Sequence, residues 1–402
     1  MIKVAVLGYG TVGSGVVEVL EKNKELIAAR TADQLEVKYI LDLRDFPGDP
    51  YEDKLVHDVN IIMEDAEVSI VCETMGGVGA AYKFTRMALE RGKSVCTSNK
   101  ELVAKYGPQL LELAHTNGCN YLFEASVGGG IPIIRPLNAS LTAEKVIAIT
   151  GILNGTTNYI LSKMEKEGAD FEEVLKEAQE KGYAERNPEA DVEGHDACRK
   201  IAILSSLMLG KTVDYEKIYT EGITKITAAD FLYAKAMGKS IKLLGISRSK
   251  LQEPYAMVAP FMISSENPLY LVSGVFNAIC VRGNMLGDSM YYGRGAGKLP
   301  TASAVVGDVI DCARHMGQAI SCLWEAEEAR LADIGEVERS FFMRIRKEAL
   351  EAVKVQFPGG EVITVEGREV LGYVTPEIKE KDCAAGYKAL GDVILSKIRI
   401  GE

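Results

Sequence analysis

The sequence lacks the patterns that mark several broad classes of protein. None of its eight cysteines belongs to a Cys-x-x-Cys pair, so it predicts neither a zinc site nor a disulfide framework. No apolar run approaches the roughly 18 residues of a transmembrane helix, and no run of Lys and Arg is interleaved with aromatic residues as in nucleic-acid-binding surfaces. We therefore expect a protein of the reducing cytoplasm with a small-molecule ligand, no nucleic-acid partner and no membrane partner.

The composition that is present suits a soluble protein of several domains. The chain has 402 residues, of which 47% are hydrophobic, enough for two or three domains with sizeable cores. Its net charge of −11 arises from interspersed acidic and basic residues. The first residues, MIKVAVLGYG, enter an apolar strand without a cleavable signal pattern, so we expect no signal peptide.

A glycine-rich turn follows the first apolar segment. Residues 2–7 lead into GYGTVG and then into the helical pattern VVEVLEK. In such a unit the first glycine permits a tight turn, the second lets the backbone approach a pyrophosphate, and the third allows the helix to pack closely on the strand. The turn predicts a dinucleotide site with contacts from Gly8, Gly10, Thr11, Val12 and Gly13.

The next segments alternate between apolar strands and helical patterns. Strands are expected at about 36–41, 68–72, 94–97 and 120–123, with helices near 79–91 and 101–117. This alternation predicts an α/β fold with a parallel, doubly wound sheet of the Rossmann type. Ligands of such sheets gather at the carboxyl ends of the strands, where the sequence places Thr74, Met75, Gly76 and Lys100. The alternative is a solvated lysine that opens the next helix, but its position at the strand ends favours a functional role.

The choice of cofactor stays open at this stage. Asp42 ends the second strand, where a carboxylate accepts the ribose hydroxyl of NAD, whereas Arg44 could meet the 2′-phosphate of NADP. Asp42 also lies further from the glycine turn than the usual spacing of about 20 residues. The sequence therefore predicts NAD or NADP without choosing.

Residues 178–200, AQEKGYAERNPEADVEGHDACRK, concentrate carboxylates and a lysine around a proline-broken turn and the start of a helix. Asp196 and Lys200 are four residues apart, so their side chains share one face of a helix. The spacing has two interpretations: an ordinary exposed ion pair, or a carboxylate that holds and tunes an amine. The apolar residues that follow place Lys200 one turn from a packed surface.

Three further segments combine glycine with polar groups. In residues 124–132, EASVGGGIP, backbone carbonyls could ring a hard cation or form a flexible turn between domains. Residues 151–158, GILNGTTN, carry hydroxyl and amide groups suited to a helix cap or a polar ligand. Residues 291–301, YYGRGAGKLPT, could close over the cofactor or form a close crossing between domains.

The last part of the chain predicts a small module of helices and strands. A helix rich in Ala and Glu is expected at 322–335. The pattern then reads as a strand, a helix, two strands, a helix and a strand, at 340–346, 347–357, 361–367, 370–375, 381–390 and 393–400. This order is βαββαβ.

Together these segments resemble the homoserine dehydrogenase family along nearly the whole chain. Residues 178–200 match the family signature Ala-x3-Gly-aromatic-small-x2-Asn-Pro-x2-Asp-aliphatic-x-Gly-x-Asp-x3-Lys without departure. The order GxGTVG, ETMGG, SNKE, EASVGGGIP, NGTTNYI and GRGAGxxPT is also the family's order. The resemblance implies reversible NAD(P)-dependent hydride transfer between L-homoserine and L-aspartate 4-semialdehyde, in threonine, methionine and isoleucine biosynthesis.

The resemblance also implies roles for individual residues. Lys200 would be the general acid/base at the substrate oxygen, assisted by Lys100, since an ammonium stabilises and protonates a developing alkoxide. The residues expected to bind homoserine are Glu185, Asp191, Asp196, Tyr183 and Thr156. Besides the first turn, the cofactor contacts would be Asp42, Arg44, Thr74, Met75, Gly76, Lys100, Gly182, Gly293, Gly295 and Gly297. A monovalent cation, usually sodium, would be held mostly by backbone carbonyls at Glu124, Val127, Gly129 and Ile131.

We expect three parts in the chain. A dinucleotide-binding domain takes residues 1–130 and about 290–325, a central α+β catalytic and dimerisation domain takes 131–290, and a βαββαβ module resembling the ACT domain takes 336–402. The ACT likeness suggests regulation by an amino acid such as threonine, or a role in assembly alone. A homodimer or homotetramer of the monofunctional enzyme form is expected.

Two other functions would use parts of the same pattern. Another Rossmann semialdehyde oxidoreductase, such as an aspartate-semialdehyde dehydrogenase, needs a nucleophilic cysteine, yet Cys96, Cys119 and Cys198 have no histidine partner in a readable pattern. A non-catalytic NAD(P)-binding amino-acid sensor would not need Lys200 in its acidic setting.

Overall fold

The computed structural model describes residues 1–249 and 253–401, and the chain divides into two compact units. Unit 1 comprises Met1–Lys145, Ala202–Tyr215 and Gly293–Ala329, and unit 2 comprises Val146–Ile201, Glu216–Tyr292 and Arg330–Glu402. Each unit has its own main sheet and core. No helix within the described residues is long and apolar enough to cross a membrane.

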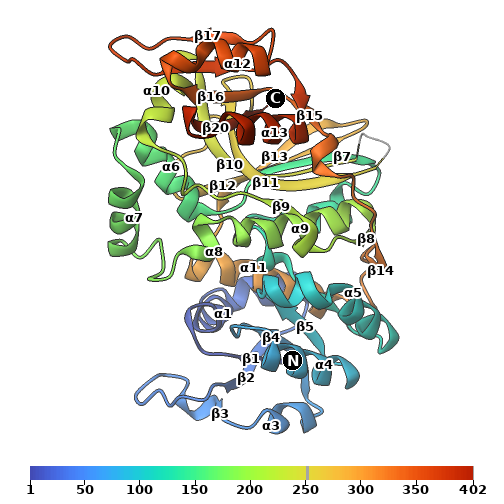
Figure 1. Ribbon diagram of the computed structural model, residues 1–402. Coiled ribbons are helices and arrows are strands. Elements are labelled where there is room, and N and C mark those ends of the chain that lie inside the picture. Colours follow the sequence, from blue (N-terminus) through green and yellow to red (C-terminus); the bar gives the residue numbers. More distant parts are fainter. Residues whose placement is uncertain (250–252, 402) are drawn as a thin grey trace. The chain divides into compact units, whose positions relative to one another are not determined.

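Unit 1 is built on a parallel six-stranded sheet (Figure 1). Its strands are β1 (Ile2–Leu7), β2 (Leu35–Leu41), β3 (Leu55–Val56), β4 (Val68–Glu73), β5 (Ser94–Thr97) and β6 (Tyr121–Leu122). They are arranged in the order β3-β2-β1-β4-β5-β6, and every pair is parallel. The order reverses between β1 and β4, which is the doubly wound arrangement of dinucleotide-binding domains. The predicted α/β fold is confirmed.

Helices cover this sheet, and one of them comes from far along the chain. The helices are α1 (Thr11–Lys22), α2 (Lys24–Thr31), α3 (Val59–Glu64), α4 (Gly79–Glu90), α5 (Lys100–Thr116) and α11 (Lys298–Arg314). Figure 1 shows orange α11 beside blue α1. Their contact is so close that a Cβ atom at Gly15 would lie 2.9 Å from the Cβ of Ala302 and 2.9 Å from the carbonyl oxygen of Lys298. The 293–329 segment is therefore an integral part of unit 1.

The helix predicted at 322–335 is wrong. This segment contains the extended strand β14 (Glu325–Glu328), which pairs with β8 (Lys211–Thr212), and then a short 3-10 turn at Ile334–Glu336. Trp324 is 5% exposed, its Nε1–H donates to the Thr212 hydroxyl at 3.2 Å, and its ring lies against Gly107. Anchoring of the tryptophan overrides the helix propensity of the Ala and Glu residues that follow.

Unit 2 contains a mixed sheet of ten strands. The strands of the central part are β7 (Val146–Ile152), β9 (Tyr219–Thr220), β10 (Lys239–Arg248), β11 (Tyr255–Ser264), β12 (Phe276–Gly283) and β13 (Gly287–Arg294). The C-terminal part adds β16 (Phe341–Ile345), β17 (Glu361–Ile363), β18 (Leu371–Val374) and β20 (Ile394–Ile400). The order is β13-β12-β7-β10-β11-β20-β16-β18-β17, with β9 on β11. Two short strands, β15 (Glu338–Arg339) and β19 (Ile378–Lys379), pair with each other.

Helices pack on one face of the central strands. The helices of this part are α6 (Gly155–Glu167), α7 (Phe171–Glu180), α8 (Glu189–Val192), α9 (His195–Leu209) and α10 (Ala228–Ala236). Helices α6 and α10 contact β10. Helix α9 approaches the same strand at Gly245, where a Cβ atom would lie 3.3 Å from the Cβ of Ile201. Glycine at this position thus lets α9 lie close to the sheet, which positions the polar residues of its first turns.

The C-terminal strands and helices follow the predicted βαββαβ order. Helix α12 (Leu350–Gln356) lies between β16 and β17, and α13 (Glu380–Leu390) lies between β18 and β20. The segment has its own apolar cluster, yet its sheet is continuous with the central one, because β20 pairs in parallel with β11 at Phe261↔Arg399 and Met262↔Ile400. By compactness the central and C-terminal parts form one unit. The predicted three-part division, its limits and the likeness to an ACT domain stay predictions.

Candidate active site

A buried lysine lies at the centre of the polar cluster in unit 2. Lys200 is 8% exposed, and its Nζ donates to Asp196 Oδ2 at 2.7 Å and to the carbonyl oxygen of Leu153 at 2.8 Å. Asp196 is 4% exposed. Exposed ion pairs contribute little and cost little, whereas a buried pair must be compensated by further hydrogen bonds. The interpretation of residues 196 and 200 as an ordinary exposed ion pair is therefore wrong.

Asn154 supplies part of that compensation. It is the N-cap residue of α6, and its Oδ1 accepts a hydrogen bond from the backbone N–H of Thr157 at 2.9 Å. Its Nδ2 donates to Asp191 Oδ1 at 2.7 Å and to Asp196 Oδ2 at 2.9 Å. One amide thus caps a helix and ties two carboxylates together, as the NGTT pattern allowed. Asn154 was not among the residues predicted for the site.

A tight turn brings the two carboxylates to the same place. Asp191 lies in the short helix α8, Asp196 lies in the first turn of α9, and Gly194 between the helices has a φ of 82°. A Cβ atom at Gly194 would also lie 3.2 Å from side-chain atoms of Thr220 and Val258. Glycine is required by both the left-handed backbone and the close approach. The predicted set of Asp191, Asp196 and Lys200 is thus assembled by one turn.

The other predicted substrate residues lie on a neighbouring loop. The Thr156 hydroxyl donates to the carbonyl oxygen of Tyr183 at 2.6 Å, and the Tyr183 ring packs edge-on against Tyr159 with centroids 4.9 Å apart. Glu185 is exposed, as is Gly182, which has a φ of 71°. Among the described residues, no hydrogen bond joins the Glu185 side chain to the Lys200 cluster. The structure therefore joins Thr156 to Tyr183 and leaves Glu185 at the surface.

In unit 1 a cavity of about 530 Å³ is lined by part of the predicted nucleotide set; Thr11, Val12, Gly13, Lys100, Gly182, Gly293, Gly295 and Gly297 are not in its lining. The predicted residues that line it are Gly8, Gly10, Asp42, Arg44, Thr74, Met75 and Gly76. Gly13 begins α1 so close to the turn that a Cβ atom would lie 1.8 Å from the carbonyl oxygen of Gly8. The turn therefore excludes side chains where a pyrophosphate would lie, and the donor groups of the turn suit a dinucleotide.

Charged groups of both signs gather at the end of β2. Asp42 Oδ2 accepts the backbone N–H of Tyr9 at 2.8 Å, and Arg44 donates to both carboxylate oxygens of Asp42 at 2.9 and 3.0 Å. The Arg44 guanidinium holds the pKa of Asp42 well below its usual range. His57 Nδ1 donates to the Asp42 carbonyl oxygen at 2.7 Å, and this bond, with nearby Asp45, raises the pKa of His57. Asp42 and Arg44, which indicated different cofactors in the sequence, thus form an ion pair with each other.

A buried carboxyl group links two strand ends of unit 1. Glu73 at the end of β4 is 0% exposed, accepts the Thr97 hydroxyl at 2.6 Å, and accepts the Met75 backbone N–H at 2.8 Å. Burial raises the pKa of Glu73 to about 7. The Thr97 hydroxyl in turn accepts the backbone N–H of Asn99, which caps α5. Lys100 is the first residue of α5, so this network fixes the start of its helix.

The two glycine-rich loops of unit 1 contact each other. A Cβ atom at Gly129 would lie 2.3 Å from the carbonyl oxygen of Gly295, and the Gly130 N–H donates to the Arg294 carbonyl at 3.2 Å. Gly293 and Gly297 flank this contact, and Gly297 has a φ of 125°. The 291–301 segment therefore contacts the 124–132 loop inside unit 1, and its two predicted roles, closing over the cofactor or crossing between domains, stay predictions.

Glu124 uses its carboxylate to cap the backbone that follows. Its oxygens accept the N–H groups of Ile133, Ile134 and Arg135 at 2.6, 2.9 and 2.6 Å. The Glu124 carboxylate is therefore engaged by backbone donors of the following segment. In the part of the chain that the structure describes, no group of three or more His, Cys, Asp or Glu side chains could hold a metal ion.

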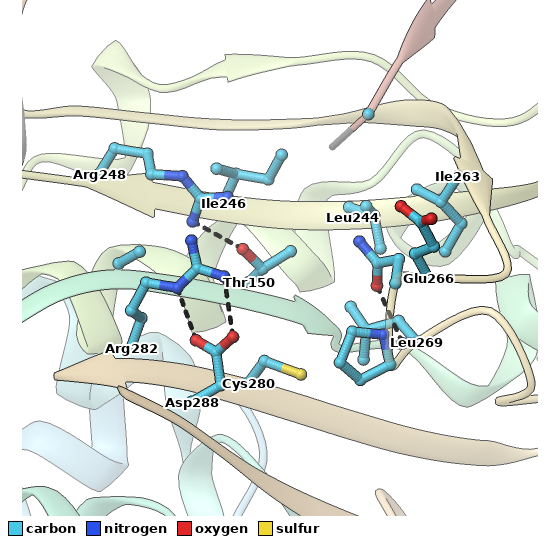
Figure 2. Close-up of a pocket in the computed structure, with 14 residues that line it drawn as sticks. Thr150, Leu244, Ile246, Arg248, Ile263, Glu266, Leu269, Cys280, Arg282 and Asp288 are labelled. Atoms are coloured by element: carbon cyan, nitrogen blue, oxygen red, sulfur yellow. Dashed lines mark hydrogen bonds and ion pairs between the residues drawn. The ribbon is translucent and has the colours of Figure 1, made fainter. Parts of the chain in front are cut away.

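Unit 2 contains a cavity of about 330 Å³ that lies over strands β7, β10 and β12 (Figure 2). Arg282 forms two hydrogen bonds to Asp288 at 2.6 and 2.8 Å, and Arg248 donates to the Thr150 hydroxyl at 2.8 Å. Figure 2 shows these polar groups directed at one another across the sheet surface. Lys200 does not line this cavity, so it is not the candidate active site.

Comparison with known families decides between the remaining interpretations. A family model described as homoserine dehydrogenase matches residues 132–310, and one described as homoserine dehydrogenase, NAD binding domain, matches residues 8–124. The chain belongs to the homoserine dehydrogenase family. It is an NAD(P)-dependent oxidoreductase, and the alternatives of a thioester-forming semialdehyde dehydrogenase and a non-catalytic sensor are excluded.

The chain is similar to individual homoserine dehydrogenases over most of their length. The homoserine dehydrogenase of Synechocystis sp. is 45% identical over 317 residues, covering 77% of this chain and 73% of that protein. That of Mycobacterium tuberculosis is 41% identical over 379 residues, covering 91% and 86%. A homoserine dehydrogenase structure from Thiobacillus denitrificans has a TM-score of 0.90 at 34% identity and covers 100% of this chain and 98% of that one. A hyperthermophilic archaeal homoserine dehydrogenase in complex with NADPH has a TM-score of 0.66 at 27% identity, covering 77% and 97%.

Burial of Glu73 predicts a pH-dependent stability for this family member. Between about pH 4.5 and pH 7 the folded carboxyl keeps a proton that the unfolded chain has released, so the free energy of unfolding falls across this window by roughly 3 kcal/mol. Glu73→Gln lacks this titration. Its melting temperature relative to wild type should therefore rise as the pH increases from about 4.5 to about 8.

Exposed Glu112→Gln is the matched control, because the Glu112 side chain lies on the surface of α5. Calorimetric melting of both variants and wild type across the pH range measures the effect. A difference between Glu73→Gln and wild type that does not vary with pH would contradict the prediction.

Proposed function

We propose that the chain interconverts L-homoserine and L-aspartate 4-semialdehyde, with Lys200 as the general acid/base at the substrate oxygen. The buried cluster of Lys200, Asp196 and Asn154 is the observation that carries the proposal. The bound nicotinamide supplies or accepts the hydride. An ammonium group has three N–H donors, and two of those on Lys200 are directed at Asp196 and the Leu153 carbonyl, so the third is available to a substrate oxygen.

The chain's own groups account for the proton and for substrate binding. Aldehyde reduction builds negative charge on the oxygen, which the Lys200 ammonium stabilises and then protonates; in the reverse direction Lys200 receives that proton. Asp191 and Asp196 attract the substrate ammonium group. Thr156, Tyr183 and Glu185 are proposed to complete the substrate surface.

The remaining cofactor contacts are proposals of the same kind. The first turn of α1, including Thr11 and Val12, would face the pyrophosphate, as helix N-termini favour anions. Lys100, held at the start of α5, would assist at the cofactor and substrate. Gly182, Gly293, Gly295 and Gly297 would lie against the cofactor.

Replacement of Lys200 by methionine tests the proposal. Methionine keeps an apolar stem but removes the proton donor, so turnover with homoserine should fall by roughly 10²- to 10⁴-fold. Because the nucleotide cavity lies in unit 1, NADP and NAD binding measured by calorimetry should persist.

Lys242→Met is the matched control for Lys200→Met. Lys242 is also a buried lysine of unit 2, 2% exposed, with its Nζ donating to the Val272 carbonyl at 2.8 Å, but it is not part of the cluster. Its variant should keep normal turnover. Near-normal turnover of Lys200→Met, with its fold intact by circular dichroism, would refute the assigned role.

We propose that both NAD and NADP bind, with His57 and Arg44 meeting the 2′-phosphate of NADP. Because the pKa of His57 is raised above 6.5, its positive charge is present at lower pH and is lost as the pH rises. NADP should therefore bind about three- to tenfold more weakly to His57→Gln than to wild type near pH 6, and this ratio should approach one near pH 8.5.

NAD serves as the internal control, since it lacks the 2′-phosphate. Its dissociation constants for wild type and His57→Gln should agree at both pH values in calorimetric titrations. An equal loss of NAD and NADP affinity would assign His57 a structural role and contradict the proposal.

Self-association into a homodimer is proposed through the β12–β13 part of the sheet. Strand β13 lies at the sheet edge, and this part exposes Met285, Leu286, Met290 and Tyr292, at 80%, 60%, 46% and 53%. Exposed edges and apolar clusters of this kind favour protein contacts. Sedimentation of wild type and Met290→Glu measures the association, and a monomeric wild type would refute it.

Three further assignments rest on the family likeness. A monovalent cation, with sodium the expected ion, would be held by the main-chain carbonyls of Glu124, Val127, Gly129 and Ile131; elemental analysis after dialysis against choline chloride tests this. Regulation by an amino acid such as threonine is proposed for the C-terminal segment. A cytoplasmic location suits the eight free cysteines.

A further inference from the structure

The end of strand β5 carries a buried hydroxyl group that has no part in the function proposed above. Thr97 is the last residue of β5 and is 0% exposed. It pairs with Glu73, the last residue of β4, which is also 0% exposed. Ligands of open α/β sheets bind beyond the carboxyl ends of the strands. This buried polar pair therefore lies next to the surface where the cofactor is expected.

The Thr97 hydroxyl links Glu73 to the segment that starts helix α5. A hydroxyl group has a single proton, and Thr97 donates it to Glu73 Oε2 at 2.6 Å. The Thr97 oxygen then accepts the backbone N–H of Asn99 at 2.9 Å. Glu73 Oε1 accepts the Met75 N–H at 2.8 Å, so donors occupy both carboxyl oxygens. The main chain adds a longer contact, from the Ser98 N–H to the Glu73 carbonyl oxygen at 3.4 Å.

Asn99 carries this link to the first turn of α5. Its Oδ1 accepts the Leu102 N–H at 3.1 Å, which is the N-cap contact of the helix. Its Nδ2 donates to the Gly77 carbonyl oxygen at 2.7 Å. Lys100 follows as the first residue of α5. The position of Lys100 therefore depends on a chain of side-chain contacts that begins at the buried carboxyl group.

We propose that Thr97, anchored by Glu73, is a positioning residue for hydride transfer that acts through Lys100 at the start of α5. The inference rests on the proposed function, in which Lys100 assists at the cofactor and the substrate. Asp42 at the end of β2 marks the adenosine half of the cofactor, so the nicotinamide half is expected over β4 and β5. Displacement of an assisting group by about 1 Å can lower turnover by about 10²-fold. Thr97 is fully buried, so it acts on the rate without touching substrate or cofactor.

The glycine turn of the nucleotide site is held by a different residue. The Thr74 hydroxyl donates to the carbonyl oxygens of Leu7 and Gly8 at 3.0 and 2.9 Å, and the Thr74 N–H donates to Leu7 at 2.9 Å. Loss of the Thr97 hydroxyl should therefore leave this turn in place while the start of α5 shifts. The expected signature is a lower kcat, with NAD and NADP dissociation constants near the wild-type values.

Replacement of Thr97 by valine tests the proposal, because valine has nearly the same shape and lacks the hydroxyl. With saturating homoserine and cofactor, kcat of Thr97→Val should fall about 10- to 100-fold. Thr97→Ser keeps the hydroxyl and should recover most of the turnover. Thr97→Ala removes the same hydroxyl in a smaller side chain and replaces the valine variant if that variant does not fold.

Thr85→Val is the matched control. Thr85 of α4 is also 0% exposed, and its hydroxyl has no hydrogen-bond partner among the residues that the structure describes. The same substitution at this position therefore removes a buried hydroxyl without breaking a contact. Its kcat should equal that of wild type.

A double-mutant cycle separates positioning of Lys100 from a general loss of structure. Lys100→Met alone should lower kcat, and Thr97→Val added to it should cause little further loss, because the group that Thr97 positions is already gone. If Thr97 only stabilised the fold, the valine substitution would lower kcat by the same factor with and without Lys100.

Hydrogen exchange provides a measurement that needs neither substrate nor cofactor. Without either ligand, the backbone amides of residues 99–104 should exchange faster in Thr97→Val than in wild type, since the start of α5 loses its anchor. The same amides should exchange at the wild-type rate in Thr85→Val. Mass spectrometry of peptides from this segment gives both rates.

Three results would overturn the proposal: near-normal kcat of folded Thr97→Val, equal losses with and without Lys100, or unchanged exchange at the start of α5. Failure of the proposed function looks different, as a wild type without homoserine turnover or a Lys100→Met variant with normal turnover. Either of these removes the role through Lys100, whereas the exchange rates still report whether Thr97 anchors α5.

Discussion

Keeping a lysine buried inside unit 2 is the constraint around which that unit is organised. A charged amine taken out of water is costly, and leaving a buried charge unpaired costs about 3–5 kcal/mol. Lys200 meets this requirement with Asp196 from its own helix and the Leu153 carbonyl from the end of β7. Asn154 then serves both Asp196 and Asp191. The turn between β7 and α6, the short helix α8 and the first turns of α9 must therefore keep their relative positions for the cluster to exist.

Unit 1 meets a different demand, which is to leave main-chain donors exposed where strands end. It does so by close backbone contacts that admit no side chains, as at Gly13 against Gly8. Its buried carboxyl, Glu73, holds the ends of β4 and β5 together through Thr97. Rigid strand ends of this kind present a nucleotide with a surface that needs little rearrangement on binding.

Much of this could be predicted because it depends on local pattern. The strand and helix alternation of unit 1 and the βαββαβ order follow from periodicity, and the shared face of Asp196 and Lys200 follows from spacing. Burial of that pair could not be predicted, since Leu153 is 47 residues from Lys200 in the sequence. The sequence pattern suited Asn154 to a helix cap, but it could not show that the same side chain donates to Asp191 and Asp196. The helix expected after Trp324 failed because the tryptophan anchors to Thr212 and Gly107, contacts that local propensity does not contain. Asp42 and Arg44 indicated different cofactors when taken singly, and the sequence could not show that they form one ion pair.

The parallel pairing of β20 with β11 has a consequence for how the protein folds while it is being synthesised. Strand β20 ends at Ile400, whereas its neighbour β11 lies at Tyr255–Ser264. Until residues 394–400 have been synthesised, one edge of β11 lacks this neighbour and exposes unpaired backbone groups. The central and C-terminal parts of the sheet of unit 2 therefore join only after β20 has been synthesised, and until then this edge is open to chaperones or to another unfinished copy.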